Sequence, residues 1–429
     1  MACTKGMLLV WLLLLPVLPC LLADDKIRYD GYQLWRIRWE DVEFSTQSLL
    51  EDFPVDIWNR SPMSADLLVS PEIQGKLRAL LDLSNVTHTV VHPDVQLTID
   101  EQMNSVQGSQ ETFPETLESF RLDKYHQFDT ISKWMIRFAR GNKNIVTLVN
   151  VGKSYHGRRM TALKIGAASR TAKEGVWIQA GVHAREWIAP ASVLYMANKL
   201  VQDFGSDSLV TNLLVHFDWY VLPVLNPDGY VYSWKTDRLW RKTRSPIPDT
   251  VCIGVDGNRN YGFEWGGAGT SADPCDNEYV GPFPFSEPEI YSVANFLYRS
   301  STKFRAFLDI HSYSQLWLFP WSYTLDPTPE ADYIKQNSVA YLAVNTIKNV
   351  HGKDYTPGPY AATMYPSNGT AIDWAYGELG IMYSYTVELR DEGQYGFLLP
   401  EHEIRPTSRE LYAAVKAVGR HLLKEKFAD

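Results

Sequence analysis

The chain has little cysteine, no long apolar run in its main part and no excess of positive charge. Four cysteines in 429 residues exclude a scaffold held together by many disulfides. Beyond residue 23 no apolar run approaches the length of a membrane span, so we expect no membrane association. Residues 122–429 carry 32 acidic and 32 basic side chains, and this balance argues against nucleic acid as a partner.

The first 23 residues have the pattern of a secretory signal peptide. Lys5 precedes an apolar run over 7–22, and a small residue stands before the polar start of the next segment. We therefore expect a secreted, extracellular protein. Its remaining cysteines are Cys252 and Cys275, for which a disulfide is favoured in an oxidising compartment. Zinc binding by these two thiols is the competing interpretation, but a second ligand pair at suitable spacing is missing.

Residues 24–121 form an acidic segment with 18 acidic and 8 basic side chains. Short strand-like runs alternate there with helical patterns, which predicts a small α+β unit. The acidity either marks a solvated surface or allows the unit to dock on a basic site elsewhere in the chain. The predicted strands are 33–39, 65–69, 88–92 and 95–99, the predicted helices are 45–51 and 72–83, and a polar linker is predicted over 104–116.

From residue 125 onward, strand-like runs alternate with helical ones. With 45% apolar residues the chain can bury a large core, and the alternation predicts an α/β domain with a largely buried mixed sheet. The predicted strands are 146–151, 160–165, 175–180, 215–224, 306–310 and 383–389, and the predicted helices are 189–204, 287–299, 331–350 and 406–424.

Residues of the kinds that bind metals stand at or near the ends of predicted strands. His183 and Glu186 follow one strand, His311 follows a second, and Glu388 lies near the end of a third. Ligands bind at the carboxyl edge of open α/β sheets. Two imidazoles and one carboxylate form a known catalytic zinc set, which leaves a coordination position for water.

Spacing alone does not select this set. The same His-x-x-acid pattern occurs at His126/Asp129 and at His351/Asp354. The pair at 183 and 186 is favoured because further residues of the same kind accompany it at neighbouring strand ends.

Seven motifs together resemble those of pancreatic-type zinc carboxypeptidases (A/B family), which are made as proenzymes. The resemblance runs from about Tyr125 to the C-terminus and is A-like, while residues 24–121 more loosely resemble the inhibitory propeptide. The motifs are Tyr155–Arg158, His183–Trp187, Asn226–Tyr230, Trp240–Ser245, Gly254–Asn260, Ile310–Tyr313 and Glu388–Asp391.

This resemblance implies a fold and a domain order. The fold is α/β, with a mixed eight-stranded twisted sheet flanked by helices, preceded by a small α+β antiparallel prodomain. The expected order is a signal peptide at 1–23, an inhibitory propeptide domain at 24–121 and a catalytic domain at 122–429. A trypsin-like protease would activate the chain at Arg121 or Lys124.

The resemblance also implies one zinc ion per chain, bound by His183, Glu186 and His311. Asp256 would hold a zinc imidazole by its second nitrogen, although an Asp at this place can also cap a loop. Glu388 would be the general base that takes a proton from water and passes it to the leaving amine. The alternative for Glu388 is a salt bridge to Arg390 or a lysine.

Several residues would bind the peptide. Arg241 would stabilise the developing oxyanion, although its basic surroundings would otherwise indicate a solvated surface. Asn258 and Arg259 would bind the terminal α-carboxylate, and Tyr365 would close over it. Further substrate contacts are implied for Arg185, Arg238, Ser312, Tyr313 and Phe397.

The side-chain pocket carries Ile372 at the position that discriminates between substrates in the family. An acidic residue would attract a C-terminal Lys or Arg, whereas an aliphatic one suits an apolar or aromatic side chain. Ser322 and Thr370 stand where the A-type pattern often has glycine, which argues against the largest aromatic side chains.

We therefore expect a monomeric, secreted zymogen that releases apolar residues from the C-termini of peptides or proteins. A related zinc carboxypeptidase with another preference and an inactive binding protein on the same fold are the alternatives. Three glycosylation sequences occur. Those at Asn59 and Asn85 are plausible, and a glycan on Asn368 would crowd the pocket.

Overall fold

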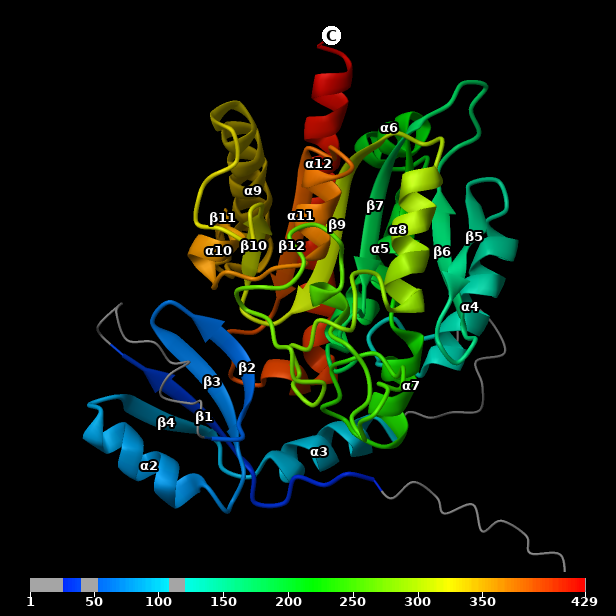
Figure 1. Cartoon of the computed structure of the whole chain (residues 1–429). Helices are drawn as coiled ribbons and strands as arrows, with labels where there is room; N and C mark the ends of the chain where they lie inside the picture. Colours follow the sequence, from blue (N-terminus) through cyan, green and yellow to red (C-terminus); the bar gives the residue numbers. More distant parts are fainter. Residues whose placement is uncertain (1–25, 40–52, 108–119, 429) are drawn as a thin grey trace, which may run out of the picture.

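The computed structural model describes residues 26–39, 53–107 and 120–428 (Figure 1). The signal-peptide prediction, the helix predicted at 45–51 and most of the predicted linker lie outside these residues. In the part that is described, no helix combines the length and the apolar character needed to cross a membrane.

In its described residues, 26–39 and 53–107, the N-terminal unit is a four-stranded antiparallel sheet with two helices. Its strand order is β2-β3-β1-β4. Trp35, Leu67 and Leu77 are fully buried and form the centre of its own apolar cluster. The elements are β1 (Gln33–Arg38), β2 (Asp56–Ser61), β3 (Ser64–Val69), α2 (Gln74–Leu83), β4 (Thr87–His92) and α3 (Val95–Gln107).

The strand predicted at 95–99 was wrong, because this segment begins α3. The side chain of Asp94 accepts hydrogen bonds from the backbone N–H groups of Gln96 and Leu97, at 3.0 and 3.4 Å, as a helix cap does. Val95 and Ile99, four residues apart, are both buried, whereas Leu97 between them is exposed. Helix α3 also continues to residue 107, so the first residues of the predicted linker, 104–107, are helical.

The larger domain is built on a mixed eight-stranded sheet with the order β11-β10-β12-β9-β7-β8-β6-β5. The four central strands, from β12 to β8, run parallel. The predicted mixed eight-stranded architecture is confirmed, although the short strands β10 and β11 were missed. The strands are β5 (Val146–Lys153), β6 (Arg159–Ile165), β7 (Glu174–Ala180), β8 (Phe217–Leu222), β9 (Phe304–Ser312), β10 (Leu316–Phe319), β11 (Thr356–Pro359) and β12 (Tyr383–Leu389).

Helices cover both faces of this sheet (Figure 1). One apolar layer lies under α5, α9 and α12, and the other lies under α8 and α11. The sequence had not predicted α4, α6, α7, α10 or α11. The helices are α4 (Phe128–Gly141), α5 (Ile188–Asp203), α6 (Ser208–His216), α7 (Pro227–Lys235), α8 (Pro288–Arg299), α9 (Glu330–His351), α10 (Tyr360–Thr363), α11 (Ala371–Gly377) and α12 (Ile404–Lys426), with short 3-10 turns η1 (Gly257–Arg259), η2 (Gly396–Leu398) and η3 (Glu401–Glu403).

The N-terminal unit packs against the larger domain beside the lower end of the sheet in Figure 1, where many loops gather. A shared apolar cluster joins the two parts, so the unit covers a defined surface of the domain. Its buried members are Leu34, Trp58, Leu68, Val95 and Ile99 from the unit and Leu239, Tyr313, Phe397 and Leu398 from the domain.

Candidate active site

Three buried side chains converge at the carboxyl ends of β7 and β9. His183 and Glu186 lie in the turn between β7 and α5, and His311 is the last residue but one of β9. The Nδ1 atom of His183 is 2.7 Å from Glu186 Oε1, and that of His311 is 3.1 Å from Glu186 Oε2. The two Nδ1 atoms are 3.2 Å apart.

This donor set fits a zinc ion. One donor atom from each residue lies within 4.8 Å of the others, a grouping found once among the residues that the structure describes. Two imidazole nitrogens that face each other in a buried site repel through their lone pairs unless a metal ion or a proton lies between them. The combination of two histidines and one glutamate suits zinc and leaves room for a further ligand.

The outer nitrogen of each imidazole faces a buried aspartate. His183 Nε2 is hydrogen-bonded to Asp256 Oδ1 at 3.0 Å. His311 Nε2 lies 3.0 Å from Asp309 Oδ2, within ion-pair distance though not aligned as a hydrogen bond. The other oxygen of Asp309 accepts a hydrogen bond from Gln179 Nε2 at 3.1 Å. Both rings are thereby oriented with Nδ1 towards the common centre.

Asp256 makes both of the contacts that the sequence left open. Besides facing His183, its Oδ1 accepts a hydrogen bond from Asn258 N at 2.8 Å, which caps η1. Its Oδ2 accepts hydrogen bonds from Arg241 Nε and Nη2, at 3.1 and 2.7 Å. Burial opposes ionisation, but the charges of Arg241 and His183 hold the pKa of Asp256 well below its ordinary value.

Asp309 was missed by the sequence analysis. It stands two residues before His311 on β9, so both side chains lie on the same face of the sheet. A carboxylate within an otherwise apolar strand was the available signal, because such a group needs a partner when it is buried.

Glu388 lies beside His311 on the neighbouring strand β12, where the two residues are in register. Its side chain lines the same cavity as the three candidate ligands. Burial raises its pKa to about 8, against the opposing effect of His311. The alternative salt bridge to Arg390 is not formed, since Arg390 is paired with Glu403 and Glu410.

Arg259 and Tyr365 face each other across this cavity. Arg259 is fully buried, and its Nη2 atom is 3.1 Å from the hydroxyl of Tyr365. Asn258 also lines the cavity, and its Oδ1 accepts a hydrogen bond from Ala371 N at 2.9 Å. The sequence-predicted residues for the terminal carboxylate are thus close together.

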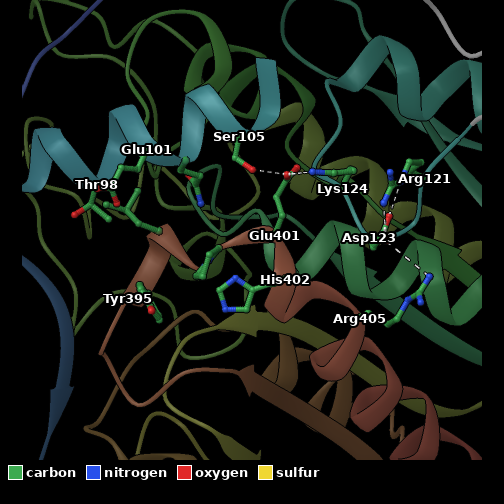
Figure 2. A pocket seen from close by; sticks show the side chains of 13 residues that line it. Thr98, Glu101, Ser105, Arg121, Asp123, Lys124, Tyr395, Glu401, His402 and Arg405 are labelled. Carbon is green, nitrogen blue, oxygen red and sulfur yellow. Dashed lines mark hydrogen bonds and ion pairs between the residues drawn. The ribbon is translucent and has the colours of Figure 1, made fainter. Parts of the chain in front are cut away.

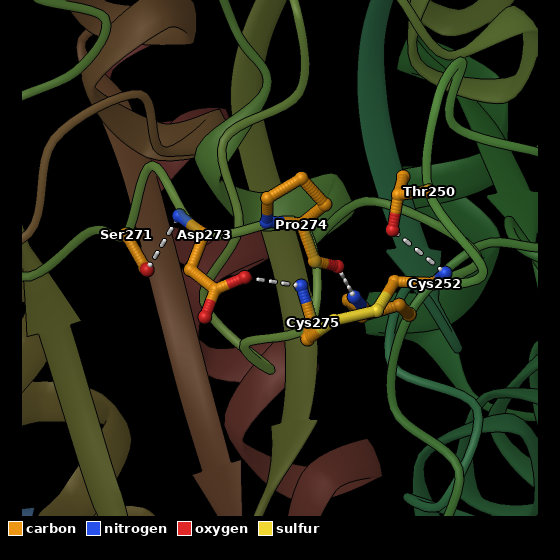
Figure 3. Close-up of a disulfide and its surroundings, with 7 residues drawn as sticks. Thr250, Cys252, Ser271, Asp273, Pro274 and Cys275 are labelled. Atoms are coloured by element: carbon orange, nitrogen blue, oxygen red, sulfur yellow. Dashed lines mark hydrogen bonds between the residues drawn. A yellow bond between two sulfur atoms is a disulfide. The ribbon is translucent and has the colours of Figure 1, made fainter.

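The predicted disulfide between Cys252 and Cys275 is present (Figure 3). The Cα atoms of the two residues are 5.1 Å apart, a usual span for such a bond. Hydrogen bonds to the side chains of Thr250 and Asp273 fix the backbone at its two ends, as Figure 3 shows. The closed loop contains η1, which carries Asn258 and Arg259.

Ile372 is fully buried in the first turn of α11. It belongs to an apolar cluster with Leu318, Tyr360 and Met364. Of these residues, Tyr360 and Met364 line the cavity, whereas Ile372 lies behind them in the same cluster and is not part of the lining. The sequence pattern gave no signal for Tyr360 and Met364. The hydroxyl of Thr370 donates to that of Ser322 at 3.1 Å, so these two predicted pocket residues are in contact.

Side chains of the N-terminal unit contact the predicted peptide-binding residues. Asp56 accepts a hydrogen bond from Arg185 at 2.6 Å, and Asp66 accepts one from the hydroxyl of Tyr313 at 2.7 Å. Of the two interpretations of the acidity, docking on a basic site is favoured by the contact between Asp56 and Arg185.

Further contacts of the unit fill the rest of the cleft. The ring of Trp58 packs on that of Phe397, with centroids 5.0 Å apart. Gln102 of α3 accepts a hydrogen bond from Arg238 Nε at 2.7 Å. With the unit in place, only about 50 Å³ of free space remains at the site, which Ser312 also lines.

Asn59 is partly buried and lines this same cavity, so the geometry argues against the glycan considered there. Asn85 lies exposed in the turn before β4, which suits a glycan.

A larger cavity of about 470 Å³ lies between α3 and the segment around η3 (Figure 2). Figure 2 shows Lys124 directed at Glu401, with its Nζ atom 2.5 Å from the carboxylate. Glu401 also accepts a hydrogen bond from Ser105 of α3, at 2.7 Å. This cavity shares no lining residue with the one that contains His183, Glu186 and His311, and it lies at the junction of the two parts of the chain.

Comparison with known protein families identifies two matching regions. Residues 131–414 match the model of the zinc carboxypeptidase family, and residues 46–102 match that of the carboxypeptidase activation peptide. The two matches cover the larger domain and the N-terminal unit.

Relatives and solved structures agree with this assignment. Carboxypeptidase A6 of Mus musculus is 36% identical over 424 residues, covering 97% of this chain and 95% of its own, and that of Homo sapiens is 38% identical over 407 residues, covering 93% and 92%. The crystal structure of thrombin activatable fibrinolysis inhibitor matches with a TM-score of 0.82 and 33% identity, covering 92% of this chain and all of its own. The chain belongs to the zinc carboxypeptidase family and is a metallocarboxypeptidase of the pancreatic proenzyme type, which uses one zinc ion and carries an activation peptide.

Proposed function

We propose that the chain is a secreted, monomeric zymogen that, once activated, releases apolar or aromatic residues from the C-termini of peptides and proteins. Residues 1–23 are its signal peptide, 24–121 its inhibitory propeptide and 122–429 its catalytic domain. This proposal rests on one cavity that contains the zinc-type cluster, which consists of His183, Glu186 and His311. Glu388 and the Arg259–Tyr365 pair line the same cavity.

Each group in the cavity has a separate task in this mechanism. His183, Glu186 and His311 would hold the zinc ion, which would supply Lewis-acid activation of a water molecule and of the scissile carbonyl. Glu388 removes a proton from the attacking water and delivers it to the leaving amine. Burial, which raises the pKa of Glu388 above its ordinary value, favours the return of the proton to the leaving amine.

Arg241 places a fixed positive charge beside the carbonyl oxygen, where negative charge develops during the reaction. Its hydrogen bonds to Asp256 hold the guanidinium in place before substrate binds. Asp256 and Asp309 orient the two zinc imidazoles, so one aspartate links the zinc site to the oxyanion site.

Recognition of the peptide end depends on Asn258, Arg259 and Tyr365. A guanidinium and a phenol offer several N–H and O–H donors to one carboxylate, and these suit a free C-terminus. Ser312, Tyr313 and Phe397, together with Arg185 and Arg238, line the path of the preceding residues. These latter contacts become available only when the N-terminal unit leaves.

Ile372 favours an apolar C-terminal side chain, because contact between two apolar surfaces removes both from water, which lowers the free energy. The contact between Thr370 and Ser322 makes this end of the pocket shallower than two glycines would. We therefore expect aliphatic and medium aromatic residues to be preferred to the largest aromatic ones. A different C-terminal preference is the second candidate.

Activation requires cleavage after Arg121. The side chain of Arg121 is 62% exposed, whereas that of Lys124 is 22% exposed and bound to Glu401. The next residue, Tyr125, is buried, and its hydroxyl donates to Leu399 O at 2.8 Å. A trypsin-like protease therefore reaches the first site and not the second.

The test is activation with trypsin followed by N-terminal sequencing and an assay of C-terminal release. We expect Leu122 as the new N-terminus, and release of Phe and Leu but not of Lys. A chelator should abolish release and added zinc should restore it. Chelator-insensitive release would contradict the zinc mechanism, and preferred release of Lys would contradict the assignment of Ile372.

Matched variants separate the two cleavage sites. Arg121→Gln should block activation and Lys124→Gln should leave it intact, because only the first removes the accessible bond. The reverse result would move the activation site to Lys124. A fully activated chain that released no residue would favour an inactive binding protein.

A further inference from the structure

The carboxylate of Glu278 lies between the two groups assigned to the terminal carboxylate of the substrate. Its Oε1 atom is 3.2 Å from Arg259 Nη2 and 3.1 Å from the hydroxyl of Tyr365. These two donors are themselves 3.1 Å apart, so the three groups form a closed triangle. All three residues line the cavity that contains the zinc-type cluster.

A peptide α-carboxylate would need these same donors. Two carboxylates cannot share one guanidinium and one phenol at close range without mutual repulsion. We propose that Glu278 is an internal carboxylate that occupies the Arg259–Tyr365 site when no substrate is bound and competes with the C-terminus of the peptide. This inference rests on the proposed function, which assigns Arg259 and Tyr365 to carboxylate recognition.

The backbone of the catalytic domain fixes the position of Glu278. Its N–H group donates to Asp276 Oδ1 at 2.8 Å, and its carbonyl oxygen accepts from Ser271 N at 3.0 Å. The disulfide at Cys275 stands three residues earlier in the same loop. Because these contacts all lie within the catalytic domain, the competition continues after activation.

The N-terminal unit strengthens the arrangement in the proenzyme. Arg60 Nη2 lies 4.0 Å from the second oxygen of Glu278, and the Arg60 guanidinium lies 4.9 Å from the centre of the Tyr365 ring. The neighbouring Asn277 donates to Asp56 Oδ1 at 2.8 Å. Before activation, the unit therefore holds Tyr365 and the internal carboxylate together.

The competition has a kinetic signature. Removing the negative charge at position 278 frees Arg259 for the substrate, so KM should fall while kcat stays the same. Hydrogen bonds between charged groups are strong enough to predict a change of about tenfold. A ligand without a carboxylate should be unaffected.

The experiment uses the full chain, expressed as the proenzyme and activated with trypsin. Glu278→Gln keeps the size of the side chain and removes its charge, and Glu264→Gln is the matched control at an exposed site of the catalytic domain. The inhibition constant of 3-phenylpropionate, an apolar monocarboxylate, and the KM of a peptide ending in Phe are measured for each. Inhibition by a dipeptide amide, which lacks the carboxylate, is measured in parallel.

We expect Glu278→Gln to bind 3-phenylpropionate about tenfold more tightly than the wild type and Glu264→Gln to bind it equally. Unchanged binding by Glu278→Gln would overturn the inference, as would an equal gain for the amide. Arg259→Lys tests the underlying function separately. If that variant binds the carboxylate as the wild type does, Arg259 is not its receptor and both proposals fail. If it binds weakly while Glu278→Gln is unchanged, only the inference fails.

Discussion

The zinc-type cluster and the peptide cleft differ in where their orienting contacts come from. Asp256 and Asp309, which face the two imidazoles, belong to the same domain as the ligands. The cleft residues Arg185 and Tyr313 are instead bonded to side chains of the N-terminal unit. Arg238 is bonded both to Gln102 of the unit and to two backbone carbonyls of its own domain. Under the proposed function, this difference predicts that the N-terminal unit would keep the proenzyme inactive by blocking access to a chemical centre that is already assembled.

The largest effect on kcat is expected at Glu388, because all groups assigned to the chemical step belong to the catalytic domain. Glu388→Gln removes the proton acceptor, so kcat of the activated enzyme should fall by about 10²- to 10⁴-fold, the usual contribution of a general base. Zinc content and thermal stability should stay close to those of the wild type, because Glu388 is not among the three ligands. Full turnover by this variant would remove Glu388 from the mechanism and weaken the comparison.

A second, smaller effect tests whether the imidazoles are oriented from within the domain. Asp256→Asn and Asp309→Asn should each weaken zinc binding about 10- to 100-fold, as is typical for a lost partner of a metal-binding imidazole. Competition with a chelator of known affinity measures this without relying on activity. Asp326→Asn, an exposed aspartate, is the control.

The two variants should differ in a second respect. Asp256 also binds Arg241, so Asp256→Asn should lower kcat even when zinc is saturating. Asp309 is bonded to Gln179 instead, and Asp309→Asn should recover kcat at high zinc. Wild-type zinc affinity in Asp309→Asn would show that this contact does not orient His311.

The contrast between the zinc-type cluster and the peptide cleft also explains which parts of the site could be predicted from the sequence. His183, Glu186, His311 and Glu388 were placed correctly at one edge of the sheet because strands β7, β9 and β12 have strong apolar patterns and parallel strands bring their ends together. Their roles beyond position came from the family resemblance. Asp309 was overlooked because the apolar residues around it indicate a buried carboxylate but do not indicate which side chain is its partner.

The contacts across the cleft were not predictable in detail. That Asp56 meets Arg185 depends on β2, a strand whose alternation is obscured by polar residues and which was not predicted. Helix α3 was taken in part for a strand, since Val95, Leu97 and Ile99 alternate with polar residues and the cap at Asp94 was not recognised. Local pattern locates an element, but the docking of two units depends on surfaces that are far apart in sequence.

The smallest of these effects is expected in the rate at which the cleaved N-terminal unit dissociates from the cleft. Asp56→Asn keeps the shape of the side chain but removes the negative charge that pairs with Arg185. The side chain of Arg185 is almost fully buried. Losing one partner of a buried, hydrogen-bonded ion pair mainly increases the dissociation rate. We expect the cleaved unit to dissociate about tenfold faster or more, measured as a shorter lag between trypsin cleavage and full activity.

The control is Asp30→Asn, because Asp30 is 62% exposed and its pair with Arg28 lies within the N-terminal unit itself. After the lag, the final rate of Asp56→Asn should equal that of the wild type, since the unit has left both enzymes. An altered final rate would mean that the N-terminal unit shapes the chemical centre and does more than cover it. An unchanged lag would mean that the N-terminal unit is bound mainly through α3, where Gln102 contacts Arg238 and Ser105 contacts Glu401.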